Sequence, residues 1–326
     1  MKIAILGAGG IARKAYLPLL TSWPEVEIVG LYSRTQTTVD QTCVQWHINF
    51  GTTDIEALLL KKPQAAFVLT NNATHFEFSK RLLDDGIDVF VEKPAASTTE
   101  EMRTLVDLAE KNNRIFMVGF NRRYDLFYQQ AKQLFKDKKI QLAIFEKHRD
   151  SAFHSSLYNN FVDDTIHQID LMRHICGEVS VLSTHQQILD GKLVGAVSVT
   201  RTPDGGLAVL MTSLSAGSWQ ERISLHGEKF SVEVDAFRQL KVKYPEREEV
   251  YGCDRPGKWI EDMKERGFYG SVSHFLECVH TRKQPLTSGQ DALKTHELID
   301  ALVEKSGEFS AKPKADWDNV PRWESK

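Results

Sequence analysis

Residues 163–174 read DDTIHQIDLMRH and carry three acids, two histidines and an arginine among apolar side chains. A carboxylate beside an imidazole suits general acid–base catalysis, because an unperturbed histidine titrates near neutral pH. On a helix at about 100° per residue, four of these side chains share an arc of roughly 60°. They are Asp163, His167, Asp170 and His174. The pattern predicts one helix on which Asp163 and His167, four residues apart, meet.

Two other interpretations of this helix face stay open on the residues alone. The face could simply be exposed to solvent. The periodicity alone supports this interpretation and a catalytic pair equally. It could also bind a metal, but no further cluster of ligands completes a site, and hydride transfer needs no metal. We therefore predict no metal site.

A glycine-rich turn near the N-terminus predicts dinucleotide binding. GAGGIA (7–12) directly follows a strand-like run and opens a helix, in the G-x-G-x-x-G/A spacing. The first glycine permits the tight turn, the second lets the backbone approach a pyrophosphate, and the final alanine allows close helix–sheet packing. The pyrophosphate would bind free N–H groups at the helix start. The predicted contacts are Gly7, Gly9, Gly10, Ile11 and Ala12.

The end of the second strand bears on the choice of cofactor. Folds selective for NAD usually place an acid here to bind the ribose 2′-hydroxyl, but LYSRT (31–35) offers Ser33 and Arg34. An arginine can pair with a 2′-phosphate, so we favour NADP(H). The alternative is NAD(H), with Arg34 a solvated surface residue.

The elements that must position these residues fall into two blocks. Up to residue 121, short apolar strands alternate with amphipathic helices, for example at 75–86 and at 98–113, where Thr98 or Thr99 would cap the helix start ahead of two glutamates. This alternation predicts βαβ units and a parallel sheet, so residues 1–121 are a predicted Rossmann NAD(P)-binding domain in an α/β protein.

Residues 122–326 are predicted to form an α+β domain for substrate binding and oligomerisation. One helix is expected over about 122–138, followed by strand-like runs joined by the turn sequences TPDGG (202–206) and HGEK (226–229). Consecutive strands joined by short turns indicate an antiparallel sheet. Two further helices are expected near 270–282 and 290–306.

Composition excludes several classes of function. A net charge of −3 without a long basic cluster argues against a nucleic-acid partner. The scattered cysteines (Cys43, Cys176, Cys253 and Cys278) indicate reduced thiols. The start of the chain does not resemble a signal peptide, and no run is apolar and long enough to span a bilayer. We expect a cytoplasmic protein without a membrane partner.

The chain resembles the glucose–fructose oxidoreductase/inositol dehydrogenase/MocA (Gfo/Idh/MocA) family. The resemblance rests on GAGGIA, TNNATHFE (70–77), VEKP (91–94) and GFNRRY (119–124), which occur in the family's order. The EKHR (146–149) and RGFYG (266–270) stretches are most similar to its virulence-factor branch. The resemblance implies a Rossmann domain followed by an open-faced, mainly antiparallel sheet domain, often used in a homo-oligomer such as a dimer or tetramer.

The same resemblance implies roles for individual residues. Lys93 of the Glu-Lys-Pro turn would touch the reacting oxygen, and Glu92 would lie beside the nicotinamide. The cofactor site would be lined by Thr70, Asn71, Asn72 and His75, and the two asparagines stand where the family has prolines. Asn121 and Arg122 would also contact the cofactor. In the family's Asp-x-Gly-x-His-x-x-Asp pattern, Asp163 and His167 would bind substrate, with His167 the acid/base. Thr165 replaces the usual glycine.

The implied activity is hydride transfer between NAD(P) and a sugar, cyclitol or related hydroxyl or carbonyl compound. His167 would exchange the hydroxyl proton, Asp163 would orient it, and Lys93 would stabilise charge on oxygen. Two alternatives are a nucleotide-binding sensor or regulator without turnover, and a glycosidase that uses tightly held NAD. The joint presence of Lys93, Asp163 and His167 favours the oxidoreductase.

Overall fold

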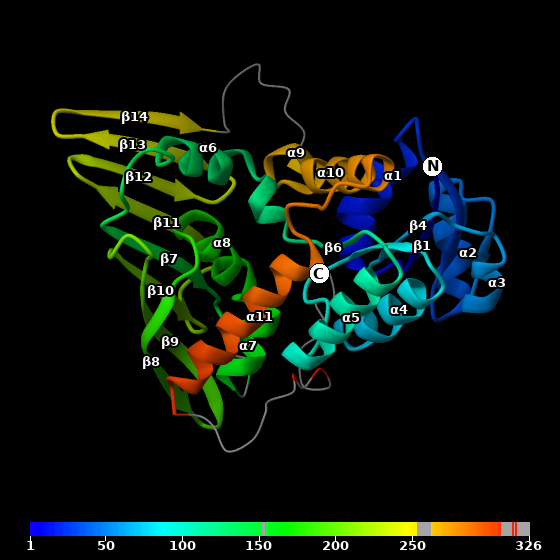
Figure 1. Ribbon diagram of the computed structural model, residues 1–326, viewed down its shortest axis with the longest axis horizontal. Helices are drawn as coiled ribbons and strands as arrows, with labels where there is room; N and C mark the ends of the chain where they lie inside the picture. The colour runs from blue at the N-terminus through cyan, green and yellow to red at the C-terminus, as the bar shows by residue number, and fades with distance from the viewer. Residues whose placement is uncertain (152–153, 155, 253–261, 308–314, 316, 318–326) are drawn as a thin grey trace. The chain divides into compact units, whose positions relative to one another are not determined.

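The computed structural model describes residues 1–151, 154, 156–252, 262–307, 315 and 317 (Figure 1). Cys253 lies outside the described residues. Contacts divide the chain into two units, which we call the Rossmann unit (Met1–Phe120 with Ser271–Lys294) and the sheet unit (Asn121–Gly270 with the described residues from Thr295 onward). Unlike the two continuous segments expected from the sequence, residues 271–294 return to the first unit. The functional division between the units stays a prediction.

The Rossmann unit contains a six-stranded parallel sheet in the order β3-β2-β1-β4-β5-β6. Its strands are β1 (Lys2–Leu6), β2 (Glu27–Tyr32), β3 (Gly51–Thr52), β4 (Ala65–Val68), β5 (Asp88–Val91) and β6 (Phe116–Val118). All residues of β4, β5 and β6 are buried, as expected for parallel strands covered on both faces. The order reverses between β1 and β4, and ligands of such sheets bind at that switch point.

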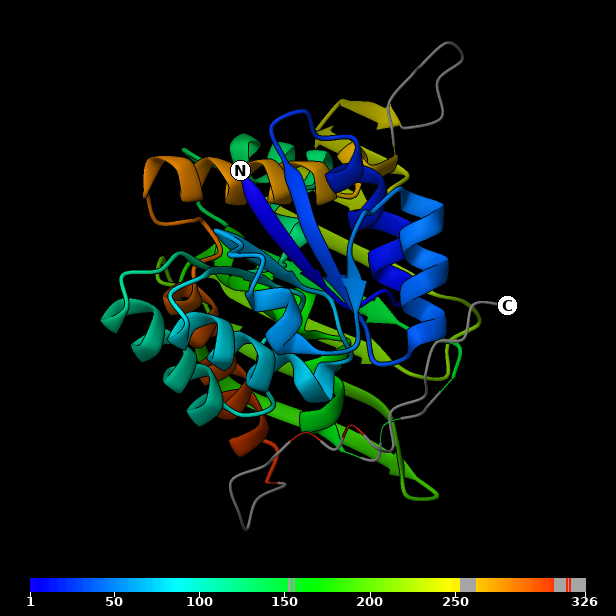
Figure 2. The same ribbon diagram turned by 90° about the vertical axis from the view of Figure 1, so that its right-hand side faces the viewer.

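Helices cover both faces of this sheet. They are η1 (Ala12–Tyr16, a π-helical turn), α1 (Leu17–Thr21), α2 (Gln36–Trp46), α3 (Ile55–Leu59), α4 (Asn72–Asp84), α5 (Thr99–Lys111), α10 (Phe268–Thr281) and the first turns of α11 (Gly289–Glu304). In Figure 2, α4 and α5 lie on one face of the sheet and α10 on the other. Phe275 of α10 packs edge-on against Phe67 and Phe90 of the strands. The predicted cap of α5 is confirmed, because Thr98 Oγ1 accepts the Glu101 N–H at 3.0 Å.

The sheet unit contains eight strands in the order β14-β13-β12-β11-β7-β10-β9-β8. They are β7 (Leu142–His148), β8 (Ser180–Leu189), β9 (Lys192–Arg201), β10 (Leu207–Ser213), β11 (Gln220–Gly227), β12 (Phe230–Asp235), β13 (Gln239–Tyr244) and β14 (Arg247–Gly252). Every pair is antiparallel except β7 with β10, which run parallel. The TPDGG and HGEK segments join β9 to β10 and β11 to β12, as predicted.

Two helices of the sheet unit pack against its strands: α6 (Leu126–Leu134) against β12 and β13, and α8 (Ile166–Cys176) against β7 and β10. The unit also contains η2 (Asn121–Tyr124), α7 (Leu157–Asp163), α9 (Asp262–Glu265) and the remainder of α11. Residues along β12 alternate between buried and half-buried, as expected for a sheet with one covered face. In the parts of the chain that the structure describes, no helix is both long and apolar enough to cross a bilayer.

Two helices are interrupted where the sequence predicted continuous ones. The helix expected over 122–138 is divided at Asp125, whose carboxylate accepts the Phe127 and Tyr128 N–H groups at 2.9 and 3.1 Å and so begins a new helix, α6. The helix expected over 163–174 is divided between α7 and α8. The carbonyl of Asn160 accepts the N–H groups of both Asp164 and Thr165 at 2.9 Å, which ends α7.

Candidate active site

The glycine turn lies at the switch point of the Rossmann sheet. Gly7 has a φ of +103°, and a Cβ at this position would lie 2.5 Å from the carbonyl oxygen of Leu69, so only glycine fits. By contrast, a Cβ on Gly9 or Gly10 would meet nothing within 4 Å. The described chain therefore leaves open the side of the turn that a pyrophosphate would approach.

The helix that follows the turn begins at Gly10 and continues through η1 into α1. Ile11 is exposed, whereas Ala12 is buried against the sheet. The Arg13 side chain donates to the Ala8 carbonyl at 2.9 Å and to Thr42 Oγ1 at 2.8 Å, which holds the turn in place. The first backbone N–H groups of this helix are available to an anion, so the site fits the pyrophosphate of a dinucleotide.

The turn provides a direct test of cofactor binding. Replacing Gly9 with alanine adds a methyl group that contacts no described atom, so we expect no change in melting temperature. We expect dinucleotide affinity, measured by calorimetry, to fall about tenfold or more, because the methyl group keeps the pyrophosphate from the backbone. Gly217→Ala is the matched control, since its Cβ also meets nothing within 4 Å. Unchanged affinity in the Gly9 variant would contradict this placement of the cofactor.

The end of β2 places Ser33 and Arg34 in different environments. Ser33 donates its N–H to the Thr52 carbonyl at 3.2 Å and is half-buried. Arg34 is exposed, and no ion pair links it to another described residue. Its guanidinium is thus accessible to an anion at the predicted ribose end of the cofactor.

The loop after β4 is tied to the Glu-Lys-Pro turn by His75. This side chain is buried; its Nδ1 lies 2.8 Å from the carbonyl oxygen of Pro94, and its Nε2 lies 3.0 Å from that of Thr70. Burial lowers the pKa of His75, so the ring is neutral and donates to one of the two carbonyls. His75 therefore positions both loops, and a contact between it and a cofactor stays a prediction.

Hydroxyl and amide groups order the start of α4. Thr74 Oγ1 lies 2.9 Å from both Thr70 Oγ1 and Asn71 Oδ1, and Asn72 is the first residue of the helix. These contacts hold the loop in which two asparagines replace the family's prolines.

Glu92 and Lys93 follow β5 directly. Glu92 is buried and accepts hydrogen bonds from the Tyr16 hydroxyl and, at 2.9 Å, from the Lys93 N–H. The Lys93–Pro94 peptide bond is cis. Tyr16 was not predicted from the sequence. Its spacing of four residues after Ala12 reads as ordinary helix packing.

In the sheet unit, Asp163 is the last residue of α7, whereas His167 lies in the first turn of α8. The predicted helical row is therefore wrong, because the backbone break at 164–165 removes the fixed four-residue spacing. Asp163 Oδ2 lies 3.5 Å from Nε2 of His154. Every residue from Ile166 to Arg173 is buried, which also excludes a solvated stripe over this range.

Asp170 and His174, the other members of the predicted row, have structural partners. Asp170 forms a two-pronged ion pair with Arg123, at 2.6 and 2.7 Å, in which both side chains are buried. His174 lies beside Lys132 at 3.1 Å. Burial, together with Arg123, Lys132 and Arg173, lowers the pKa of His174 to about 3, so this ring remains neutral.

Thr165, where the family has glycine, has ordinary right-handed backbone angles, with φ −78° and ψ −9°. Its hydroxyl donates to Asn160 Oδ1 at 2.8 Å in a buried setting. The backbone thus does not require glycine here, and the threonine side chain helps to join α7 to α8.

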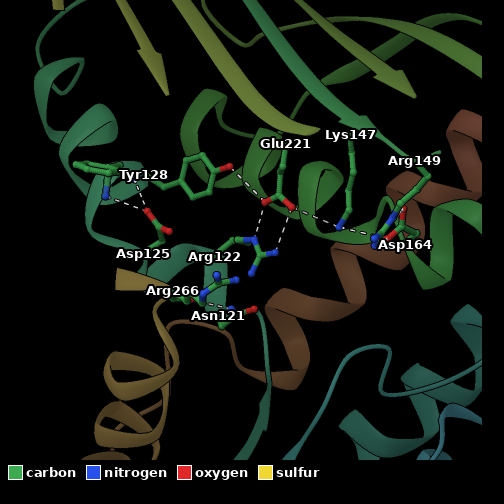
Figure 3. A network of polar contacts seen from close by, with 10 residues as sticks. Asn121, Arg122, Asp125, Tyr128, Lys147, Arg149, Asp164, Glu221 and Arg266 are labelled. Atoms are coloured by element: carbon green, nitrogen blue, oxygen red, sulfur yellow. Dashed lines mark hydrogen bonds and ion pairs between the residues drawn. The ribbon is translucent and has the colours of Figure 1, made fainter. Parts of the chain in front are cut away.

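A chain of alternating charges links Asp164 of this segment to β7 and β11 (Figure 3). We call it the charge chain: Arg122, Glu221, Lys147, Asp164 and Arg149. Arg122 donates to both Glu221 oxygens at 2.5 and 3.1 Å. Lys147 Nζ lies 3.5 Å from Glu221 Oε2 and 3.4 Å from Asp164 Oδ1, and the Arg149 guanidinium binds both Asp164 oxygens. Of these residues, Arg122 alone was predicted from the sequence to contact the cofactor.

The electrostatics of the charge chain depend on burial. Glu221 and Lys147 are almost inaccessible to solvent. Burial alone would raise the pKa of Glu221, but Arg122 and Lys147 lower it to about 2. Burial lowers the pKa of Lys147, while Asp164 and Glu221 oppose that shift. Glu221 therefore remains a carboxylate at neutral pH.

Asn121 and Arg122 are both anchored within the sheet unit. Asn121 Nδ2 donates to the Arg266 carbonyl at 2.8 Å, and the Arg122 guanidinium also lies over the Phe237 ring, 4.7 Å from its centre. The Arg266 guanidinium lies over the same ring at 4.4 Å. Contact of Asn121 and Arg122 with a cofactor stays a prediction.

A family model described as an oxidoreductase family with an NAD-binding Rossmann fold (GFO_IDH_MocA) matches residues 1–120. The oxidoreductase YceM of Salmonella typhimurium is 28% identical over 306 residues, covering 93% of this chain and 97% of the relative. The scyllo-inositol 2-dehydrogenase (NAD(+)) of Bacillus subtilis is 25% identical over 312 residues, with 90% of each chain covered.

A solved structure, that of the dehydrogenase MviM from Clostridium difficile, has a TM-score of 0.84 at 26% identity and covers 92% of this chain and 97% of its own. The similarity therefore extends through both units and is not confined to the glycine turn.

Proposed function

Because the chain belongs to the Gfo/Idh/MocA family of oxidoreductases, we propose that it transfers a hydride between a nicotinamide dinucleotide and a hydroxyl or carbonyl group of a sugar or cyclitol. The observation that carries the proposal is the glycine turn, with Gly7 in a conformation that only glycine adopts easily and an open approach at Gly9 and Gly10. The scyllo-inositol 2-dehydrogenase among its relatives supports a cyclitol or sugar as the substrate class.

We propose three catalytic residues. The nicotinamide, when bound, supplies the hydride acceptor or donor. Lys93, directly after β5, stabilises negative charge that develops on the substrate oxygen. His167 takes the hydroxyl proton during oxidation and returns it during reduction. Asp163, which contacts His154, binds the substrate.

The experiment that tests this proposal is a substrate screen. Sugars, cyclitols and their keto forms are incubated with NADP(H) or NAD(H), and the absorbance of the reduced nicotinamide is followed. We expect net oxidation or reduction of at least one polyol or its ketone. Tight cofactor binding without turnover would favour a sensor, and glycoside cleavage without net reduced cofactor would favour an NAD-dependent glycosidase.

We further propose that NADP(H) is preferred over NAD(H). The support is the exposed guanidinium of Arg34 and the absence of an acid from LYSRT. Replacing Arg34 with alanine should weaken NADPH binding about tenfold and NADH binding much less, because a charge-assisted hydrogen bond contributes about 1.5–3 kcal/mol. Fluorescence titration with both cofactors gives the ratio of affinities, with Arg103→Ala as an exposed arginine control. An equal loss for both cofactors would contradict recognition of a 2′-phosphate.

A homo-oligomeric state and a cytoplasmic location are also proposed. They are supported by the family membership and by the composition of the chain, and sedimentation of the purified protein tests the first.

A further inference from the structure

Tyr16 occupies an unusual position for a buried phenol. It is the last residue of the π-helical turn η1, nine residues after Gly7, and it is fully buried. Its ring centre lies 6.3 Å from that of Phe67 and 5.5 Å from that of Phe90, two side chains that also contact Phe275. π-helical turns within longer helices occur frequently at functional sites.

The hydroxyl of Tyr16 connects this aromatic cluster to the Glu-Lys-Pro turn through a hydrogen bond. It donates to Oε1 of Glu92, while Oε2 of the same carboxylate accepts the N–H of Lys93 at 2.9 Å. The helix after the glycine turn is thereby joined, through one side chain, to the backbone of Lys93. In the same turn, His75 contacts the carbonyl oxygen of Pro94.

Packing alone does not account for the hydroxyl. A phenylalanine would fill the same space among the aromatic rings, and a buried carboxylate and phenol both lose hydration. Burial, followed by the charge and hydrogen bond of Glu92, raises the pKa of Tyr16 well above its usual value. The phenol therefore stays protonated and serves as a permanent donor to the Glu92 carboxylate.

We propose that Tyr16 is a positioning residue that fixes the Glu92 carboxylate and, through it, the Lys93 backbone, and so orders the surface against which the nicotinamide half of the cofactor binds. The inference rests on the proposed function for its role in catalysis, although the ordering of the turn exists in the free protein. The ADP half is contacted by the glycine turn and should not depend on the Tyr16 hydroxyl.

The test uses Tyr16→Phe, which removes one oxygen and keeps the ring. Tyr251→Phe is the control, because its hydroxyl also donates to a glutamate, Glu249, at 2.9 Å, but from β14 of the sheet unit. In the free protein, hydrogen exchange of the peptide covering residues 92–97 should accelerate about tenfold in the Tyr16 variant and remain unchanged in the control, as expected for loss of one buried charge-assisted hydrogen bond.

Cofactor fragments then separate the two halves of the site. We expect the dissociation constant of the preferred reduced dinucleotide to rise about five- to tenfold in Tyr16→Phe, and that of its matching fragment without nicotinamide, ADP-ribose or its 2′-phosphate, to change less than about twofold. Equal weakening of both would indicate a general folding defect and overturn the inference.

A pH profile distinguishes positioning from packing. Tyr16 donates a hydrogen bond that stabilises the charged form of Glu92, so without it the dinucleotide affinity of Tyr16→Phe should fall more steeply with decreasing pH than that of wild type. Two neighbouring titratable groups are present in wild type as well: His75, which contacts the backbone of Glu92, and Lys93, whose N–H the Glu92 carboxylate accepts. Adding Glu92→Gln to Tyr16→Phe should abolish the extra pH dependence, and its persistence in the double variant would refute the role of Glu92.

The outcomes distinguish this inference from the proposed function. If wild-type protein binds no dinucleotide, the proposed function fails, and the exchange experiment still decides whether Tyr16 orders the turn. If wild-type protein binds the dinucleotide but exchange, affinity and pH profile are unaltered in Tyr16→Phe, the positioning role is wrong.

Discussion

Replacing His167 with alanine is expected to lower kcat/KM by about 10²–10⁴-fold and to leave the dissociation constant of the dinucleotide within about twofold, because a positioned acid–base group contributes that much to rate and little to ground-state binding. The prediction rests on the proposed role of His167 and on its fixed place in the first turn of α8. Steady-state kinetics with the substrate found by the screen, together with calorimetric titration of cofactor, measure both quantities.

The control for this experiment is His226→Ala. His226 lies in β11 of the same unit, and its ring contacts Ser231 Oγ at 2.9 Å. We expect it to alter kcat/KM little, so a comparable loss in both variants would indicate a structural effect. If His167→Ala weakened cofactor binding as much as it lowered turnover, the acid–base assignment would be wrong.

The second large effect is expected on stability. Replacing Glu221 with glutamine should lower the free energy of unfolding of the sheet unit by about 3–5 kcal/mol, because it leaves the cations of a buried ion-pair network uncompensated. Glu221 is inaccessible to solvent, and it contacts both Arg122 and Lys147. Urea denaturation monitored by circular dichroism at neutral pH tests this value.

The stability difference between wild type and Glu221→Gln should also depend on pH in a predictable direction. The pKa of Glu221 is lowered to about 2 in the folded protein, so its stabilisation is present above the unfolded pKa and is lost as the pH falls towards 2. The stability difference between wild type and Glu221→Gln should therefore shrink between about pH 5 and about pH 3. A difference that stays constant over this range would contradict the depressed pKa.

Glu56→Gln is the matched control. Glu56 also forms a two-pronged ion pair with an arginine, Arg81, at 2.6 and 2.8 Å, but both side chains are exposed. Exposed ion pairs contribute little to stability. No measurable change in the denaturation midpoint is expected for this variant. A loss of stability equal to that of Glu221→Gln would show that burial of the ion pair does not cause the larger effect.

Local signals in the sequence determined the Rossmann unit, its cofactor turn and most helices and strands. The α5 cap at Thr98 and the hairpins at residues 202–206 and 226–229 were predicted because each depends on a few adjacent residues. Strands β13 and β14 were not predicted. In β13, QLKVKY, only Leu240 and Val242 are buried, and in β14, REEVYG, no residue is buried, so both strands carry few apolar residues.

Tertiary structure alone decided which polar groups meet. Tyr16 and Glu92 are 76 residues apart and Arg122 and Glu221 are 99 apart, so no spacing rule connects them. The break between α7 and α8 depends on Asn160, whose carbonyl accepts the Thr165 N–H that a continuous helix would direct to Phe161, and whose side chain accepts the Thr165 hydroxyl. Periodicity and turn chemistry act over a few residues and can be read along the chain, whereas ion pairs and buried hydrogen bonds depend on strand order, which folding establishes.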